Sequence, residues 1–344
     1  MGKTAARPAR AKKAPLDVDR HRLLSRRIND LGLKIRGTRL EALIEQVYGE
    51  LENAGISFRP RTYLSDEWGC PNRIPVIGIP FYLADPVLCT LEDEMTGIEA
   101  ETDSEATIYL RHEVGHAFNY AYRLYGTESW RETFGPFSRP YDEEYTPAPF
   151  SMSFVRNSPG WYAQKHPDDD FAETFAVWLN PESGWRKTYD GTAAMAKLLY
   201  VNDAAAVYGK APPVVKTGRL DTPVEDMTMT LDSWYQTCRE VSSKRLPLPR
   251  ALDIDVRRLF PAGQGQAAGE FLFANRRTLV RGVNSWTGVD RHLVAGLVDE
   301  LIERAAALNL KTAGSLDPGE LARASVFLAA LAMNYLRHGQ FVPD

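Results

Sequence analysis

The chain has 344 residues, of which 44% are hydrophobic and 25% are charged, and its formal net charge is -4. This is the composition of a globular protein long enough to hold one large or two modest domains. A mildly acidic body argues against a nucleic-acid-binding protein, which normally carries a basic face. No run of about 18 apolar residues is present, so we expect no membrane span.

The first 16 residues form a tail rich in Ala and Pro that carries only positive charge, because no acid precedes Asp17. We expect this tail to be disordered and solvated. It lacks the apolar segment of a secretory signal. The three cysteines, Cys70, Cys89 and Cys238, are too few for a disulfide framework. Together these features predict a protein of the reducing cytoplasm.

Helical periodicity after capping boxes predicts helices over residues 38–55 and 102–124. Between them, residues 56–64 and 74–83 are rich in Ile, Val, Phe and Tyr and are interrupted by prolines, which suits strands near the edge of a sheet. The first half of the chain therefore predicts a small sheet with a helix on each side of it in sequence.

The next segment, over residues 127–165, is rich in Pro, Ser, Tyr and Gly and shows no sustained period, which predicts a long functional loop. A compact helix is expected over residues 168–179, with three aspartates in its first turn, where they suit the helix dipole. The remainder is mostly helical. We therefore expect an α+β protein with one domain over residues 17–244 and a helical C-terminal region over residues 245–344.

The sequence Arg-His-Glu-Val-Gly-His ends in a His-Glu-x-x-His motif, at His112, Glu113 and His116, inside a helix predicted on independent grounds. Residues four apart lie on one helical face, so both imidazoles can reach a single zinc ion at about 2.0 to 2.1 Å. Glu113 would flank the open position and act as general base toward a water activated by the ion. The motif predicts a zinc-dependent hydrolase.

A catalytic zinc needs a third protein ligand, and Glu173 is the best candidate, because a carboxylate among Phe and Ala is costly to bury unless it is paired or binds a metal. Asp169 and Asp170 precede it by four and three residues on the same side of the helix. Either could accept a hydrogen bond from the second nitrogen of a zinc-binding histidine. The alternative is that Glu173, Asp169 and Asp170 are ordinary solvated acidic residues of a helix.

Two segments of the chain resemble a known group of enzymes. The segments HEVGHAF, over residues 112–118, and HPDDDFAETFAVWL, over residues 166–179, resemble the gluzincin zinc metallopeptidases. More closely, the chain is similar to the bacterial family described as putative zinc-binding metallopeptidases. The resemblance is clear over residues 61–180. It implies a zincin-like core and a peptidase that cleaves peptide bonds.

The resemblance also implies particular roles. One zinc ion would be held by His112, His116 and Glu173, with Glu113 as the base. The strand over residues 76–83 would be an edge strand along which an extended peptide substrate pairs.

An oxyanion donor near the third ligand is also implied, for which His166 and Tyr162 are the candidates. Val177 stands where thermolysin-like members carry an aspartate that orients a histidine, which favours Asp169 or Asp170 for that task.

Two other interpretations remain open at this stage. A deformylase or deacylase would pair the helix motif with an upstream cysteine ligand, and Cys89 is the nearby candidate. Alternatively, the zinc could be structural, in an interaction protein whose helical C-terminal region binds partners. A closed fourth coordination position would distinguish that protein from an enzyme.

Overall fold

The computed structural model describes residues 20–96, 100–141, 145, 147–242, 248–260, 263–313 and 318–338. Most of them are helical. The helices are α1 (Arg20–Leu24), α2 (Arg39–Asn53), α3 (Pro86–Thr96), α4 (Asp103–Tyr122), α5 (Glu128–Phe134), α6 (Pro167–Leu179), α7 (Trp185–Thr188), α8 (Ala194–Tyr208), α9 (Leu231–Ser242), α10 (Asp253–Leu259), α11 (Ala268–Ala274), α12 (Arg276–Thr287), α13 (Arg291–Ala307) and α14 (Pro318–His338), and the strands are β1 (Arg61–Ser65) and β2 (Val76–Pro80). The basic tail over residues 1–16 and the predicted boundary at residues 244 and 245 lie outside the described residues.

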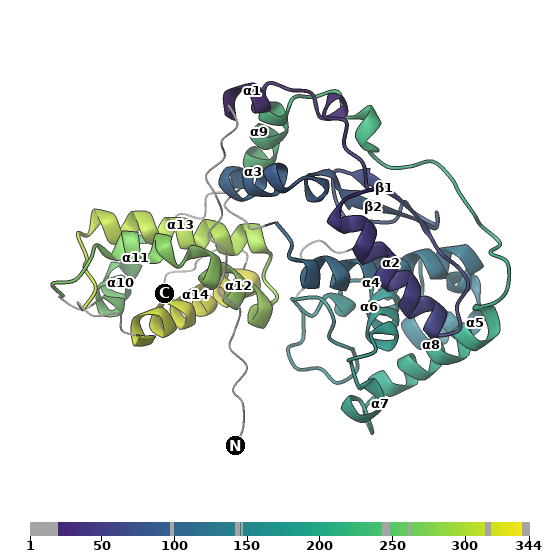
Figure 1. Cartoon of the computed structure of the whole chain (residues 1–344). Helices are drawn as coiled ribbons and strands as arrows, with labels where there is room; N and C mark the ends of the chain where they lie inside the picture. The colour runs from purple at the N-terminus through teal and green to yellow at the C-terminus, as the bar shows by residue number, and fades with distance from the viewer. Residues whose placement is uncertain are drawn as a thin grey trace, which may run out of the picture.

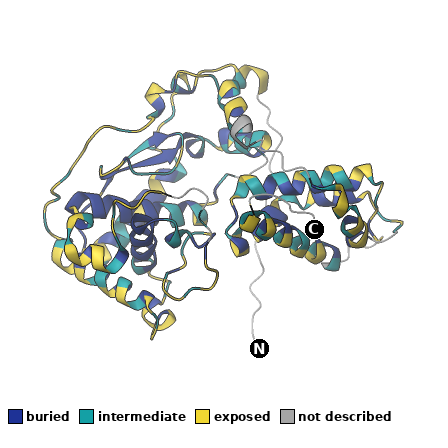
Figure 2. Cartoon of the chain, turned by 180° about the vertical axis from the view of Figure 1, so that it is seen from behind, coloured by how far each residue is buried: buried dark blue, intermediate teal, exposed yellow. Residues whose placement is uncertain are grey.

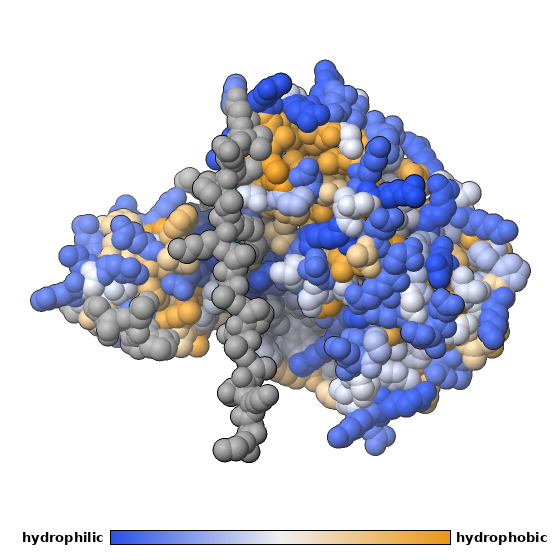
Figure 3. Space-filling view, viewed as in Figure 1, coloured by the Kyte–Doolittle hydropathy of each residue, from blue (hydrophilic) through white to orange (hydrophobic). Residues whose placement is uncertain are grey.

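The chain forms two lobes, each with its own hydrophobic core (Figure 1). The larger lobe contains α1 to α9 and both strands. The smaller lobe contains α10 to α14, and each of its helices contributes buried apolar side chains, for example Val256, Leu272, Leu279, Leu297 and Leu328. Figure 3 shows that the visible face of the larger lobe is mostly hydrophilic, with an apolar area near its upper edge. None of the helices in the described ranges combines the length and apolar character needed to cross a membrane.

The two strands of the sheet are shorter than expected, and β2 has a pairing partner on each of its sides. β1 and β2 pair in parallel, with Arg61 opposite Val76. On its other side, Gly78 of β2 forms an antiparallel bridge with Gly69, in which the N–H of each glycine donates to the carbonyl of the other. The expected free edge over residues 76–83 is therefore occupied at Gly78, and residues 81–84 form a 3-10 turn instead of strand.

The helices α4 and α6 cross closely at the buried centre of the larger lobe (Figure 2). Gly115 of α4 permits this approach, because a Cβ at that position would lie 2.8 Å from Cα of Ala172 and 2.9 Å from its carbonyl oxygen. Both helices were expected from periodicity, and the capping box at the start of α4, between Thr102 and Glu105, is present. The crossing brings the first half of α6 against the middle of α4.

Part of the segment over residues 127–165 is helical, which its composition did not predict. It contains α5, whose first turn is capped by the hydroxyl of Thr127, which accepts from the N–H of Trp130. Trp130 and Phe134 are buried, and their rings pack against Phe171 of α6. Part of the segment is therefore anchored to the helix that carries the carboxylates.

Candidate metal centre

The two histidines of the His-Glu-x-x-His motif lie one turn apart on α4, and their Nε2 atoms are 3.0 Å apart. Asp169, in the first turn of α6, lies between them: its Oδ1 atom is 3.8 Å from Nε2 of His112 and 3.5 Å from Nε2 of His116. All three side chains are buried. Among the described residues, no other group of three or more His, Cys, Asp or Glu side chains brings its possible ligand atoms close enough together to hold a metal ion.

The three separations, 3.0, 3.5 and 3.8 Å, bracket the spacing of ligands around a tetrahedral zinc ion. Ligands at about 2.0 to 2.1 Å from zinc lie roughly 3.3 to 3.5 Å from one another. In addition, Oδ2 of Asp169 and Oε2 of Glu113 are buried without a hydrogen-bond partner among the described residues. Buried carboxylate oxygens of this kind are costly unless a cation satisfies them. The donor set therefore fits a divalent metal.

A carboxylate from α6 lies at the outer ring nitrogen of each histidine. Nδ1 of His112 is 2.8 Å from Oε1 of Glu173, and Nδ1 of His116 is 3.1 Å from Oδ2 of Asp168. Carboxylates in such positions fix the orientation and tautomer of metal-binding imidazoles. The expected roles of Glu173 and Asp169 are thus exchanged. Glu173 was expected to bind the metal but lies at Nδ1 of His112, whereas Asp169 lies between the two Nε2 atoms.

Glu173 is held in this position by the loop before α6. Its carboxylate accepts hydrogen bonds from the side-chain amide of Asn157 at 3.1 Å, from the backbone N–H of Ser158 at 2.8 Å and from the hydroxyl of Ser158 at 2.6 Å. Burial on its own would raise the pKa of Glu173, but the hydrogen bonds from His112 and Ser158 lower it below its ordinary value. An ionised Glu173 accepts a hydrogen bond from the Nδ1–H of His112. The proton of the neutral ring is then on Nδ1, so Nε2 is free to bind a metal.

Asp168 lies at the corresponding position beside Nδ1 of His116. It accepts from the side-chain amide of Asn119 at 2.7 Å and from the hydroxyl of Tyr120. Burial opposes its ionisation, but the charge of His116 and these hydrogen bonds keep the pKa of Asp168 low. Sequence analysis did not identify Asp168, because an aspartate at the first turn of a helix already has an ordinary explanation as a dipole-stabilising residue.

Asp170, the other expected partner of a histidine, pairs elsewhere. Its Oδ2 atom is 2.6 Å from Nζ of Lys197 in α8, and the same ammonium group donates to the carbonyl of Ser153. Burial raises the pKa of Asp170 to about 7, against the opposing charge of Lys197. Asp170 therefore ties α6 to α8 rather than orienting a histidine.

Glu113 lies beside the ligand set and has the properties of a proton acceptor. Burial raises the pKa of this carboxyl group, the charge of Asp169 adds to the effect, and His112 and His116 oppose it. A carboxylate with a raised pKa accepts a proton more readily near neutral pH. The thiol of Cys70, which sequence analysis left without a role, donates to the backbone carbonyl of Glu113 at 3.4 Å.

The two candidate oxyanion donors have different surroundings. His166 caps α6: its Nδ1 accepts from the N–H of Asp168 at 3.1 Å, so its Nε2 carries the proton and donates to the carbonyl of Arg139 at 2.7 Å. Both of its ring nitrogens are therefore engaged by the backbone. Tyr162 instead places its ring edge-on to His112, with centroids 5.6 Å apart. Burial, and then the charges of Asp169 and Glu113, raise the pKa of Tyr162, which keeps its hydroxyl protonated.

A pocket of about 450 Å³ is lined by Tyr120 and Asp168, both of which contact His116. Its buried wall includes Tyr120, His166 and Asp168, and its rim carries two exposed arginines, Arg73 and Arg139. Cys70, whose thiol donates to the backbone carbonyl of Glu113, also lines this pocket.

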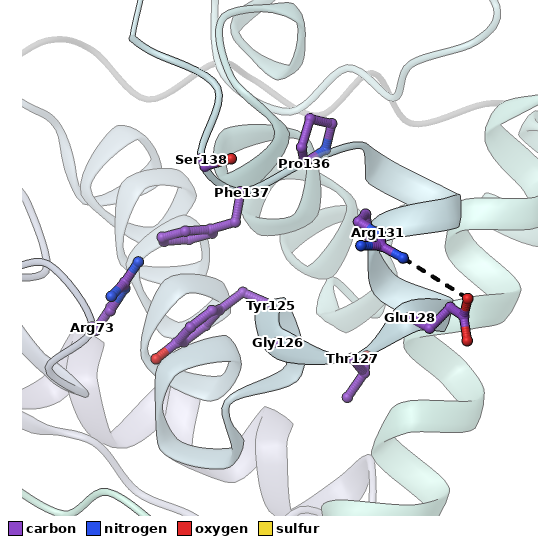
Figure 4. A pocket seen from close by; sticks show the side chains of 9 residues that line it. All are labelled: Arg73, Tyr125, Gly126, Thr127, Glu128, Arg131, Pro136, Phe137 and Ser138. Carbon is purple, nitrogen blue, oxygen red and sulfur yellow. Dashed lines mark ion pairs between the residues drawn. The ribbon is translucent and has the colours of Figure 1, made fainter.

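A second pocket, of about 430 Å³, shares Arg73 and Phe137 with the first (Figure 4). The guanidinium of Arg73 lies over the rings of Tyr125 and Phe137, 5.3 Å from each centroid. On the opposite side, Arg131 pairs with Glu128 at 3.8 Å. Arg73 thus belongs to both pockets and makes no ion pair with a described residue.

Cys89 does not join the metal centre. Its thiol donates to the carbonyl of Tyr82 at 3.2 Å, and it is not one of the grouped metal-binding side chains among the described residues. The ligand set of a deformylase is therefore not present around this cysteine.

Comparisons with protein-family models, with curated proteins and with solved structures gave no match.

Proposed function

We propose that the protein is a zinc-dependent hydrolase that binds one zinc ion through Nε2 of His112, Nε2 of His116 and the carboxylate of Asp169. The main support is the convergence of these three atoms at tetrahedral spacing, with a carboxylate behind each histidine. Three protein ligands leave a fourth position for water or substrate, as in catalytic zinc sites.

Within this class we propose a metallopeptidase with a zincin-like core, acting on peptides or proteins in the cytoplasm. This narrower proposal is supported by the resemblance of residues 112–118 and 166–179 to gluzincin peptidases. It differs from the gluzincin pattern at one position, because Asp169 takes the place of Glu173 as the third ligand.

The proposed mechanism assigns a task to each side chain. Zinc, when bound, would supply a nucleophilic water near neutral pH and polarise the substrate carbonyl. Glu113 would accept the proton of the attacking water and deliver it to the leaving amine. Glu173 and Asp168 would hold the imidazoles in the tautomer that presents Nε2. Tyr162, protonated and beside His112, would donate to the developing oxyanion.

A second candidate is a non-catalytic protein stabilised by zinc. The burial of His112, His116 and Asp169, at 4%, 7% and 3% exposure, is the observation that favours it, since structural zinc sites are closed. The two candidates differ in whether substrate reaches the fourth position.

The test is a comparison of Glu113→Gln with the unmodified protein and with Glu128→Gln, a control at an exposed glutamate. Zinc content and cleavage of a diverse peptide library are measured for each. We expect all three to hold one zinc ion, and Glu113→Gln to lose at least about 100-fold in turnover. Equal cleavage by Glu113→Gln would refute the mechanism. Full zinc loading without any cleavage by the unmodified protein would favour the non-catalytic candidate.

A further inference from the structure

The smaller lobe contacts the larger one through one face of α12 and through α13, whose Arg291 pairs with Glu101 at 3.7 Å. Arg277, Arg281 and Gly288 are spaced by four and seven residues, so they lie on the same side of this helix and at its end. Figure 1 shows α12 on the side of the smaller lobe that faces the larger lobe. The opposite side of α12 carries buried residues of the smaller core, including Leu279 and Val283.

Two arginines of this face bind acids of the larger lobe. Arg277 pairs with Asp93 of α3, and Arg281 donates to Oε2 of Glu105 at 2.8 Å. Glu105 is the capping-box glutamate of α4, and the same oxygen accepts from the backbone N–H of Thr102 at 2.9 Å. The smaller lobe thus reaches the start of the helix that carries both histidines.

The end of α12 meets the turn that precedes α6. A Cβ on Gly288 would lie 2.8 Å from the carbonyl oxygen of Gly160 and 3.1 Å from Cδ1 of Trp161. The two backbones are therefore in direct contact, and no side chain fits between them. The carbonyl of Gly160 also accepts from the hydroxyl of Tyr145 at 3.0 Å.

This turn is strained. Gly160 has φ of 91° and Trp161 has φ of 60°, so two successive residues lie in the left-handed region, one of them with a large side chain. Backbone strain of this kind persists only where surrounding contacts hold it. The guanidinium of Arg156 over the Trp161 ring, at 3.6 Å, and Gly288 on the other lobe supply such contacts.

The same turn carries residues of the metal centre at both of its ends. Ser158, two residues before Gly160, donates twice to Glu173, which accepts from Nδ1 of His112. Tyr162, two residues after Gly160, lies edge-on to the His112 ring. A displacement of Gly160 would therefore move the groups that orient His112 from two sides.

We infer that the smaller lobe is a positioning element of the metal centre, in which Gly288 holds the turn over residues 158–162 and, through Glu173 and Tyr162, the orientation of His112. This inference rests on the proposed zinc site, and it assigns a role to the C-terminal region. Gly288 is a positioning residue, since it touches neither the ligands nor a substrate.

The first test is Gly288→Ala in the full chain, with Gly55→Ala as a matched control. Both glycines follow a helix with positive φ, 77° for Gly288 and 81° for Gly55, so alanine strains both backbones similarly. A Cβ on Gly55 meets nothing within 4 Å. In competition with a chelator, we expect Gly288→Ala to bind zinc about tenfold more weakly, as after loss of an orienting contact, and Gly55→Ala to bind like the unmodified protein. Equal zinc affinities in the two variants would overturn the inference.

A second measurement uses the unmodified protein, in case Gly288→Ala does not fold. Coupling between sites is reciprocal, so zinc should in turn strengthen the contact between the lobes. We expect zinc to slow amide hydrogen exchange over residues 158–162 and around Gly288, as well as in α4 and α6. Protection confined to α4 and α6 would count against the inference.

The two proposals fail in distinguishable ways. A protein that binds no zinc at all overturns both of them. A protein that binds zinc tightly and cleaves peptides, but whose affinity for zinc is indifferent to Gly288→Ala, retains the proposed function and loses this inference alone.

Discussion

Oδ1 of Asp169 lies 3.5 Å from Nε2 of His116, a separation that suits two ligands of one ion. Glu173, one turn later on the same helix, is hydrogen-bonded to the opposite ring nitrogen of His112. Two carboxylates four residues apart thus occupy different positions around the histidines, and their substitutions should have different consequences.

We predict that Asp169→Asn weakens zinc binding far more than Glu173→Gln does. Loss of a ligand removes a metal bond, whereas loss of a carboxylate behind a histidine costs about 10- to 100-fold in affinity. Chelator competition on both variants measures the difference, and Asp170→Asn, at the neighbouring residue paired with Lys197, is the control. A larger loss in Glu173→Gln would assign the ligand role to Glu173.

We predict that Gly115→Ala destabilises the protein by about 1 to 3 kcal/mol through overpacking at the crossing of α4 and α6. Its Cβ would lie 2.8 Å from Cα of Ala172. The control is Gly49→Ala in α2, where nothing lies within 4 Å and alanine should stabilise the helix by up to about 1 kcal/mol. Denaturant unfolding gives both values. Stabilisation by Gly115→Ala would show that the helices can separate without loss.

The sequence predicted the elements around the centre better than their contacts. The helix with His112 and His116 was found because periodicity, a capping box and the motif agree. Which carboxylate of α6 faces the Nε2 atoms depends on where the helices cross along their axes. One turn, about 5.4 Å, separates Asp169 from Glu173. That offset is set by Gly115 against Ala172, a contact between distant residues that no local pattern records.

Other features lacked a sequence signal for similar reasons. An imidazole is an uncommon helix cap, so the sequence placed His166 at the entry of this helix without predicting that its ring caps it. On the side of β2 away from β1, the partner of Gly78 is the single residue Gly69, which forms no strand of its own. Ser158 lies in a segment without periodicity, and only the fold brings it to Glu173.

We predict that Arg73 contributes to substrate choice. It lines the pocket that Tyr120, His166 and Asp168 also line, and it makes no ion pair with a described residue, so it can attract a carboxylate of the substrate. Because this arginine is exposed, the effect should be about 0.5 to 1 kcal/mol, or roughly two- to fivefold. The measurement compares kcat/KM for peptide pairs that differ by Glu against Gln. Arg73→Gln should lose the preference for Glu, whereas Arg131→Gln, whose arginine is already paired with Glu128, should keep it. An unchanged preference in Arg73→Gln would remove Arg73 from substrate recognition.

The last prediction concerns Glu92 of α3. Burial raises the pKa of its carboxyl group from the ordinary 4.5 to about 7, and the charge of Glu101 adds to this rise. Its Oε2 atom is buried without a hydrogen-bond partner among the described residues. The folded protein thus favours the neutral form up to about pH 7, while the unfolded chain releases the proton near pH 4.5.

The stabilising contribution of neutral Glu92 is therefore complete below about pH 4.5 and is lost as the pH rises to about 7. Glu92→Gln remains neutral at every pH. We expect it to be as stable as the unmodified protein at pH 4 and more stable at pH 8, by up to about 3 kcal/mol. Urea unfolding of metal-free protein at pH 4, 6 and 8 measures this difference. The matched control is Glu94→Gln, at a more exposed glutamate of the same helix. A constant difference between Glu92→Gln and the unmodified protein at all three pH values would mean that Glu92 is already ionised in the folded protein.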